Sequence, residues 1–213
     1  MSKSIIGYLL LILAFSSHYA FAQYAGYNEV KDKVTFKKNF AIGAKNIMSI
    51  KSSFVQEKNL SMLSEKIISQ GKFWFKREQK VRIEYEKPFR YLLLINGDQI
   101  LIRDDQKETK MSAHSNKLFQ QINKVIVDCL SGAILENKDF APRVFQNEKM
   151  YLLEMSPVSK GIKEFFQTII VLVNKDDWSV TSIQMNEAGG DNTIIRFSDK
   201  ALNQKLDDTL FTR

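Results

Sequence analysis

The segment 71–88 reads GKFWFKREQKVRIEYEKP, and its second half decides the fold class. Val81, Ile83 and Tyr85 alternate there with charged residues, a period of two. This alternation is typical of a β-strand with one apolar face, because successive side chains of a strand point to opposite sides. Pro88 then ends the predicted strand, since proline has no N–H to donate to a sheet.

Further short segments rich in β-branched and aromatic residues lie on both sides of this strand. Residues 91–95 and 99–103 flank Asn96-Gly97-Asp98, where Asn and Gly accept the positive φ of a tight hairpin. Strand patterns return, with turn residues between them, over residues 143–146, 149–155, 164–173, 178–186 and 192–197. Many short strands without an alternation of strands and helices predict an antiparallel sheet.

Two segments have a helical period instead. Residues 29–48 carry apolar side chains at spacings of three, four and seven, which predicts an amphipathic helix with these residues on its apolar face: Val30, Val34, Ala41, Ala44, Ile47 and Met48. Residues 118–130 predict a second helix, ended by Ser131-Gly132, with one apolar face: Leu118, Phe119, Ile122, Val125, Ile126, Cys129 and Leu130. Both helices are expected to cover the concave face of the sheet. Periodicity leaves two alternatives open beneath them, a packed core and a pocket for an apolar ligand.

Composition excludes several classes of protein. The 213 residues fit one domain, and no repeat or linker divides them. One Cys excludes an internal disulfide, and two His argue strongly against a multi-histidine metal site. The net charge is +7, but the basic residues form no clustered stripe along the sequence, so we expect no nucleic-acid partner. The sequence has no G-x-S-x-G motif that could supply a nucleophilic serine for a catalytic triad with His114. The three Asp pairs lie in turns or near element ends, where Asp is favoured for local hydrogen bonds. We therefore expect no enzyme, no metal and no cofactor.

The first 22 residues have the features of a signal peptide. Lys3 precedes an apolar run over residues 5–15, and Ala20-Phe21-Ala22 has the A-x-A form of a cleavage site. The run is shorter than the roughly 20 residues that span a bilayer. We therefore expect cleavage after Ala22 and export of a soluble chain, residues 23–213.

Several motifs occur in a fixed order along the chain. They are F-x-Q in Ser52–Gln56, the aromatic strand led by Gly71, the strand over residues 81–88, the hairpin Asn96-Gly97, and the closing segment 191–197 continued to Asn203 and Phe211. Together they resemble the LolA-like family of periplasmic lipoprotein carriers, over residues 30–211. Two departures from the family pattern are Glu78, where a turn proline is expected, and Ile83, where the family usually has Trp.

The resemblance implies an α+β fold, an incomplete (unclosed) antiparallel β-barrel with a helical lid over an apolar cavity. It implies a periplasmic, non-catalytic carrier of acylated lipoproteins, and a monomer is expected. An inner-membrane ABC transporter would be the donor, and an outer-membrane receptor or the membrane itself the acceptor. The alternative is a lipid- or lipoprotein-sensing binding module of an envelope regulatory system, because related half-barrels have that role.

Apolar residues of the strands and of the second helix are expected to line the acyl-chain cavity, and for each of them a close-packed core position is the alternative. The expected lining is Phe73, Phe75, Val81, Ile83, Tyr85, Leu92, Leu94, Ile100, Ile102, Ile122, Val125, Ile126 and Cys129. Arg77 matches a family arginine whose implied role is to hold the lid through hydrogen bonds to backbone carbonyls. A solvated turn arginine is the alternative at that position.

Overall fold

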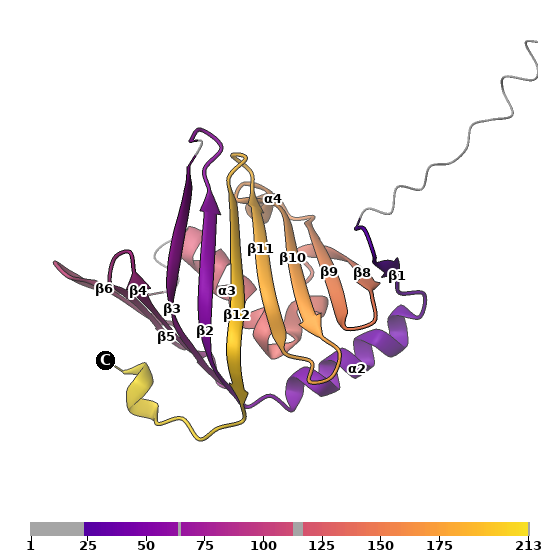
Figure 1. Ribbon diagram of the computed structural model, residues 1–213, viewed down its shortest axis with the longest axis horizontal. Coiled ribbons are helices and arrows are strands. Elements are labelled where there is room, and N and C mark those ends of the chain that lie inside the picture. The colour runs from indigo at the N-terminus through magenta and orange to yellow at the C-terminus, as the bar shows by residue number, and fades with distance from the viewer. Residues whose placement is uncertain (1–23, 64, 113–116, 213) are drawn as a thin grey trace, which may run out of the picture.

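The computed structural model describes residues 24–63, 65–112 and 117–212. The expected signal peptide and His114 lie outside these residues. Within them, the strands form one twelve-stranded antiparallel sheet with β1 and β7 at its edges, so the sheet does not close into a barrel (Figure 1). In spatial order the strands are β1 (Asn28–Glu29), β8 (Phe140–Gln146), β9 (Met150–Pro157), β10 (Phe166–Asn174), β11 (Val180–Glu187), β12 (Asn192–Leu202), β2 (Ser49–Asn59), β3 (Lys66–Lys76), β4 (Lys80–Lys87), β5 (Tyr91–Asn96), β6 (Gln99–Asp104) and β7 (Glu108–Ser112). The predicted antiparallel, unclosed sheet is confirmed.

Three α-helices and two 3-10 turns complete the described fold: α2 (Lys33–Lys45), α3 (Lys117–Ser131), η3 (Ala133–Glu136), α4 (Lys160–Lys163) and η4 (Asp208–Phe211). In Figure 1, α3 lies behind the sheet, and α2 runs along the end of the sheet opposite α4. The main core fills the space between the sheet and α2 and α3. We call the sheet face that carries this core the inner face.

Helix α2 is present where the sequence predicts a helix, but the predicted buried face is partly wrong. The Asp32 side chain caps the helix by accepting from the Thr35 N–H at 2.9 Å. The helix buries Phe36, Phe40, Gly43 and Ala44. Val34 is 81% exposed and Met48 55% exposed, although both were expected to be buried, and Ala41 is exposed as well.

Aromatic packing explains which side of α2 turns inward. Phe36 lies edge-on to Tyr151 of β9, with ring centres 4.7 Å apart, and Tyr151 stacks on Trp178 at 5.3 Å. A Cβ on Gly43 would lie 2.2 Å from the Trp178 ring, so the helix approaches this ring as closely as glycine permits. Two Phe rings bury more apolar surface than Val34 and Ala41 would, and they decide the orientation.

Helix α3 confirms the helix predicted over residues 118–130. It is followed by Gly132 with φ 80°, a left-handed conformation that favours glycine. A Cβ on Gly132 would lie only 2.4 Å from the Cβ of Ala44 in α2. The C-terminal ends of α2 and α3 therefore meet at the pair Gly132 and Ala44.

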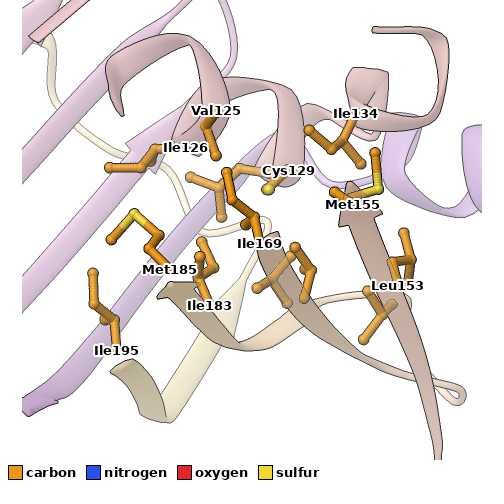
Figure 2. Packing of buried hydrophobic residues seen from close by; sticks show 14 of the residues in the cluster. Val125, Ile126, Cys129, Ile134, Leu153, Met155, Ile169, Ile183, Met185 and Ile195 are labelled. Carbon is orange, nitrogen blue, oxygen red and sulfur yellow. The ribbon is translucent and has the colours of Figure 1, made fainter. Parts of the chain in front are cut away.

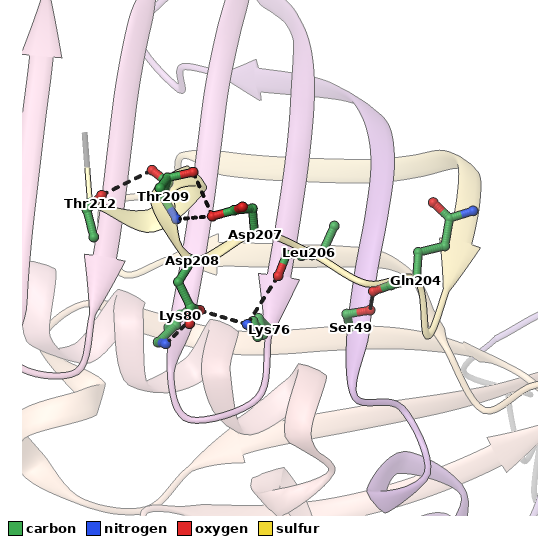
Figure 3. A network of polar contacts seen from close by, with 9 residues as sticks. All are labelled: Ser49, Lys76, Lys80, Gln204, Leu206, Asp207, Asp208, Thr209 and Thr212. Atoms are coloured by element: carbon green, nitrogen blue, oxygen red, sulfur yellow. Dashed lines mark hydrogen bonds and ion pairs between the residues drawn. The ribbon is translucent and has the colours of Figure 1, made fainter.

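The outer face of the sheet is crossed by residues 203–212, which we call the C-terminal strap (Figure 3). The Ser49 hydroxyl donates to the Gln204 carbonyl at 2.6 Å. Lys76 donates to the Leu206 carbonyl at 3.1 Å and, together with Lys80, forms ion pairs with Asp208. These contacts tie the end of the chain to β2, β3 and β4.

Candidate functional site

Two cross-strand rows of apolar side chains cover the inner face of β3 to β6. The strand register aligns Phe75, Val81, Ile95 and Ile100 in one row and Phe73, Ile83, Leu93 and Ile102 in the other. Each row takes one residue from each of four neighbouring strands, and directly opposed residues pack against one another. Phe73, Phe75, Val81, Ile83, Ile100 and Ile102 were expected on this surface, and the register brings them together.

Leu92 and Leu94 require a correction, because they lie on the outer face. They are opposite Glu84 and Arg82 of β4, whereas Leu93 and Ile95 are opposite Ile83 and Val81. With Leu101 they form a separate small apolar cluster. The run Leu92-Leu93-Leu94-Ile95 is apolar on both faces, so its period does not reveal which residues point inward. The residues that the sequence analysis missed here are Leu93 and Ile95.

Phe54 and Tyr85 continue the apolar surface beyond these rows. Their rings lie edge-on, 5.0 Å apart, and the Tyr85 hydroxyl donates to the Gln56 side chain at 2.8 Å. Burial raises the pKa of Tyr85 to about 12, so this hydroxyl remains a proton donor over the physiological range. Gly71 makes room for the pair, because a Cβ there would lie 2.9 Å from the Phe54 ring.

Helix α3 covers the inner face with buried apolar side chains. Figure 2 shows Val125, Ile126 and Cys129 pointing from the helix toward Ile169, Ile183 and Ile195 on the strands. Val125, Ile126 and Cys129 were expected to form the inner side of a lid, and the helix turns them to the sheet. The side chain of Ile122 lies outside the described part of the chain. Complete burial raises the pKa of the Cys129 thiol, which keeps it protonated.

The described side chains leave little space between Ile126 of α3 and the sheet. A cavity of about 10 Å³ lies there, lined by Phe54, Phe73, Ile83, Tyr85, Ile126, Ile183, Ile195 and Phe197. This volume barely admits one water molecule. In this conformation the described side chains around this cavity therefore form a packed core, and a hydrocarbon chain between them needs part of α3 to move away.

The described contacts of α3 with the sheet are apolar, and the side chains of Lys124 and Asp128 bond to each other and to the segment after the helix. Lys124 and Asn137 both donate to the Asp128 carboxylate, at 2.8 and 2.7 Å, so these bonds link α3 to itself and to the segment after it. Apolar packing has no directional requirement, so another apolar group can replace it. The C-terminal end of α3 is fixed by Gly132 against Ala44.

Arg77 is bonded to the C-terminal end of α2. Its Nε donates to the Ile47 carbonyl at 3.0 Å, and its Nη2 donates to the Ala44 carbonyl. The alternative of a solvated turn arginine is therefore wrong. Glu78 and Gln79 have φ of 72° and 62°, which proline cannot adopt, so the turn after Arg77 differs from one built on proline.

Among the residues that the structure describes, the Ser52 hydroxyl and Gln121 Oε1 are buried without a hydrogen-bond partner. Ser52 is paired with Phe73 across the sheet, so its side chain points to the inner face. Within residues 24–63, 65–112 and 117–212, no three His, Cys, Asp or Glu side chains gather as metal ligands. The same residues contain no helix with the length and apolar character needed to cross a membrane.

The family model for the outer membrane lipoprotein carrier protein LolA matches residues 45–213. This protein belongs to the LolA family. A curated relative, the outer-membrane lipoprotein carrier protein of Chromohalobacter salexigens, is 22% identical over 144 residues, which are 68% of this chain and 66% of that protein. LolA-family proteins are periplasmic carriers or binding modules and not enzymes. The match leaves out nearly all of α2.

Solved structures match this chain at low sequence identity. An uncharacterized conserved protein from Thermus thermophilus has a TM-score of 0.50 and 8% identity, covering 84% of this chain and 92% of that one. A LolA superfamily protein from Nitrosomonas europaea has a TM-score of 0.45 and 13% identity, covering 83% of this chain and 97% of that one.

Proposed function

We propose that this protein carries acylated lipoproteins through the periplasm by binding their acyl chains between α3 and the inner face of the sheet. The observation that carries the proposal is the helix α3, which covers a continuous apolar sheet surface through apolar side chains. Membership of the LolA family supports the same function. The proposed donor is an inner-membrane ABC transporter, and the proposed acceptor is an outer-membrane receptor or the membrane itself.

Binding and release both require a closed site that opens at moderate cost. Exposing Val125, Ile126, Cys129 and Leu130 by lifting α3 costs about 1.5–3 kcal/mol for each larger side chain. Burying one palmitoyl chain contributes about 11 kcal/mol, at about 0.8 kcal/mol per CH₂. The two quantities are similar, so one chain can hold the site open, and loss of that chain closes it again. Such a balance suits a carrier that gives up its load.

Export is part of the proposal. Residues 1–22 would direct the chain across the inner membrane, and cleavage after Ala22 would leave Gln23 at the N-terminus. Tyr24 then lies against the sheet, with its hydroxyl donating to Glu154 of β9 at 2.8 Å. The N-terminus of the proposed mature chain would therefore be anchored within two residues of the cut.

The test is binding of a fluorescent palmitoylated peptide, measured by anisotropy. Ile126→Glu places a carboxylate in the proposed acyl-chain site and is expected to abolish binding, because burying an unpaired charge is costly. Lys124→Gln is the matched control, since it changes the net charge equally on the exposed side of α3 and should bind like the wild type. Circular dichroism must show that both variants are folded.

A folded Ile126→Glu variant with normal binding would contradict the proposed site. Transfer between vesicles then separates a carrier from a sensor. A carrier at substoichiometric concentration accelerates movement of the palmitoylated peptide from donor to acceptor vesicles, whereas a sensor retains the peptide. Native mass spectrometry of the protein isolated from periplasm would identify the acylated species bound in the cell.

A further inference from the structure

The side of α2 that faces away from the sheet is itself apolar and basic. At 100° per residue, the side directly opposite the buried Phe36 and Phe40 contains Val34, Lys38, Ala41, Ile42 and Lys45. All five are exposed, and the exposed Met48 follows three residues after the helix end. We call these six residues the α2 outer face.

Three large apolar side chains on this face are in contact with solvent. Val34 is 81% exposed, Ile42 52% and Met48 55%. The exposed side of a helix in a globular protein is normally polar or charged, because its apolar side is turned to the core. The α2 outer face therefore has the composition of a surface that another apolar phase covers.

The charge on this face is positive and uncompensated. Within the described part of the chain, Lys38 and Lys45 form no ion pair. The carboxylates that contact α2 are engaged elsewhere: Glu29 pairs with Lys33, Glu136 pairs with Lys37, and Asp32 caps the helix. The whole chain carries a net charge of +7, which adds to the attraction toward a negative surface.

We infer that the α2 outer face docks the protein on the surface of an anionic phospholipid bilayer. Helices with apolar residues between lysines lie in the membrane interface, where the apolar side chains enter the acyl boundary and the lysines reach the headgroups. A protein partner is the less suitable occupant, because the face has no Tyr, Trp or Arg of the kind that anchors protein interfaces.

The position of α2 suits this role. It runs along the end of the sheet opposite α4, and its buried side is fixed to the sheet by Phe36, Phe40 and Gly43 (Figure 1). Docking through its outer side needs no change in the core. Docking through the α2 outer face is separate from the proposed acyl-chain binding, because nearly all of α2 precedes residues 45–213 and its outer side faces away from the core.

The test uses the exported, processed protein and sedimentation with vesicles of phosphatidylethanolamine and phosphatidylglycerol in a 3:1 ratio, with phosphatidylcholine vesicles for comparison. We expect binding to the anionic vesicles at low salt, and weaker binding at 0.5 M NaCl because salt screens exposed charges. The double variant Lys38→Glu/Lys45→Glu should bind more than tenfold less tightly. Val34→Ser/Ile42→Ser should weaken binding severalfold and keep the salt dependence.

The matched control is Lys160→Glu/Lys163→Glu on α4, at the other end of the sheet, which changes the net charge equally. It should bind within twofold of the wild type. Equal losses in both charge variants would overturn the inference, because net charge alone would then cause binding. The inference would also be overturned if the wild type did not sediment with anionic vesicles. Binding to an acidic protein in place of the vesicles, lost in the Lys38→Glu/Lys45→Glu variant, would overturn it as well. Binding of the palmitoylated peptide should be unchanged in the Lys38→Glu/Lys45→Glu variant, which separates this inference from the proposed function.

Discussion

At the scale of single residues, Ser52 is a polar group buried in an apolar surface. It is 2% exposed, and its hydroxyl has no hydrogen-bond partner. A buried unpartnered hydroxyl costs about 1–3 kcal/mol of folding free energy. We predict that Ser52→Ala raises the free energy of unfolding by about 1 kcal/mol, measured by urea denaturation.

Ser53 provides the control on the same strand. It lies on the opposite face, where its hydroxyl accepts from Lys72 at 3.1 Å. Ser53→Ala should leave the free energy of unfolding unchanged or slightly lower, because a half-buried hydrogen bond at the surface contributes little. Destabilisation by Ser52→Ala would mean that this hydroxyl has a partner in solution, and the prediction would be wrong.

At the scale of elements, the sequence predicts which segments form helices and strands better than it predicts which face they bury. Residues 81–85 alternate cleanly, so their inward residues are predicted correctly. The run from Leu92 to Ile95 is apolar on both sides, and only pairing with β4 places Leu93 and Ile95 inward. Neighbouring strands therefore decide a face that the local period leaves undetermined.

The predicted buried face of α2 is partly wrong for a related reason. Apolar residues lie on both its sides, so spacings of three and four join Val34 and Met48 to residues that are truly buried. The aromatic contacts of Phe36 and Phe40 decide the orientation, and these contacts depend on Tyr151 and Trp178, more than a hundred residues away. The closed state of the site was likewise beyond prediction, since periodicity does not distinguish a packed core from a pocket.

The contact between α2 and α3 makes an element-scale prediction. Gly132→Ala should lower the free energy of unfolding by about 3 kcal/mol, because alanine is strained at φ 80° and its Cβ would lie 2.4 Å from the Ala44 Cβ. Urea denaturation measures the loss. Adding Ala44→Gly removes the clash and should restore part of the stability, so the two substitutions are coupled by at least about 1 kcal/mol.

Gly97→Ala is the control that measures the cost of backbone strain alone, without a contact between helices. Gly97 has φ 58°, and a Cβ there would meet nothing within 4 Å. This variant should lose only about 1 kcal/mol. If Gly132→Ala costs no more than Gly97→Ala, the ends of α2 and α3 are not in close contact, and the proposed fixed end of the lid is wrong.

At the scale of the whole molecule, the sheet has an apolar core on both faces. The inner face is covered by α2 and α3, and the outer face of β2 to β5 is crossed by the C-terminal strap, whose Phe211 is buried and lines one groove with Leu94 and Leu101. The Arg82 guanidinium donates to the Leu210 carbonyl at 3.0 Å and holds the end of the strap on β4. The outward Leu94 of β5 thus lines the same groove as Phe211 of the strap, whereas the proposed acyl-chain site lies on the inner face beneath α3.

The strap is also held by the ion pairs of Asp208, so the free energy of unfolding depends on pH in the acid range. Hydrogen bonds from Lys76 and Lys80 lower the pKa of Asp208 to about 2, from an ordinary value of 3.8. Because the pKa is lower in the folded state, the carboxylate stabilises the fold above pH 3.8, and this contribution is lost as the pH falls from about 4 to 2. Other carboxylates titrate in the same range, so the wild type alone does not isolate this effect.

The difference in free energy of unfolding between the wild type and Asp208→Asn isolates it, since the other carboxylates are common to both proteins. We predict that this difference favours the wild type at pH 5, shrinks steadily below pH 4 and vanishes near pH 2. Salt at 0.5 M should reduce it at pH 5, because Asp208 is exposed and its ion pairs are screened. When both proteins also carry Lys76→Met/Lys80→Met, the difference in free energy of unfolding caused by Asp208→Asn should no longer shrink as the pH falls from 5 to 2. A difference that stays constant from pH 5 to pH 2 would show that the two lysines do not hold the strap through Asp208.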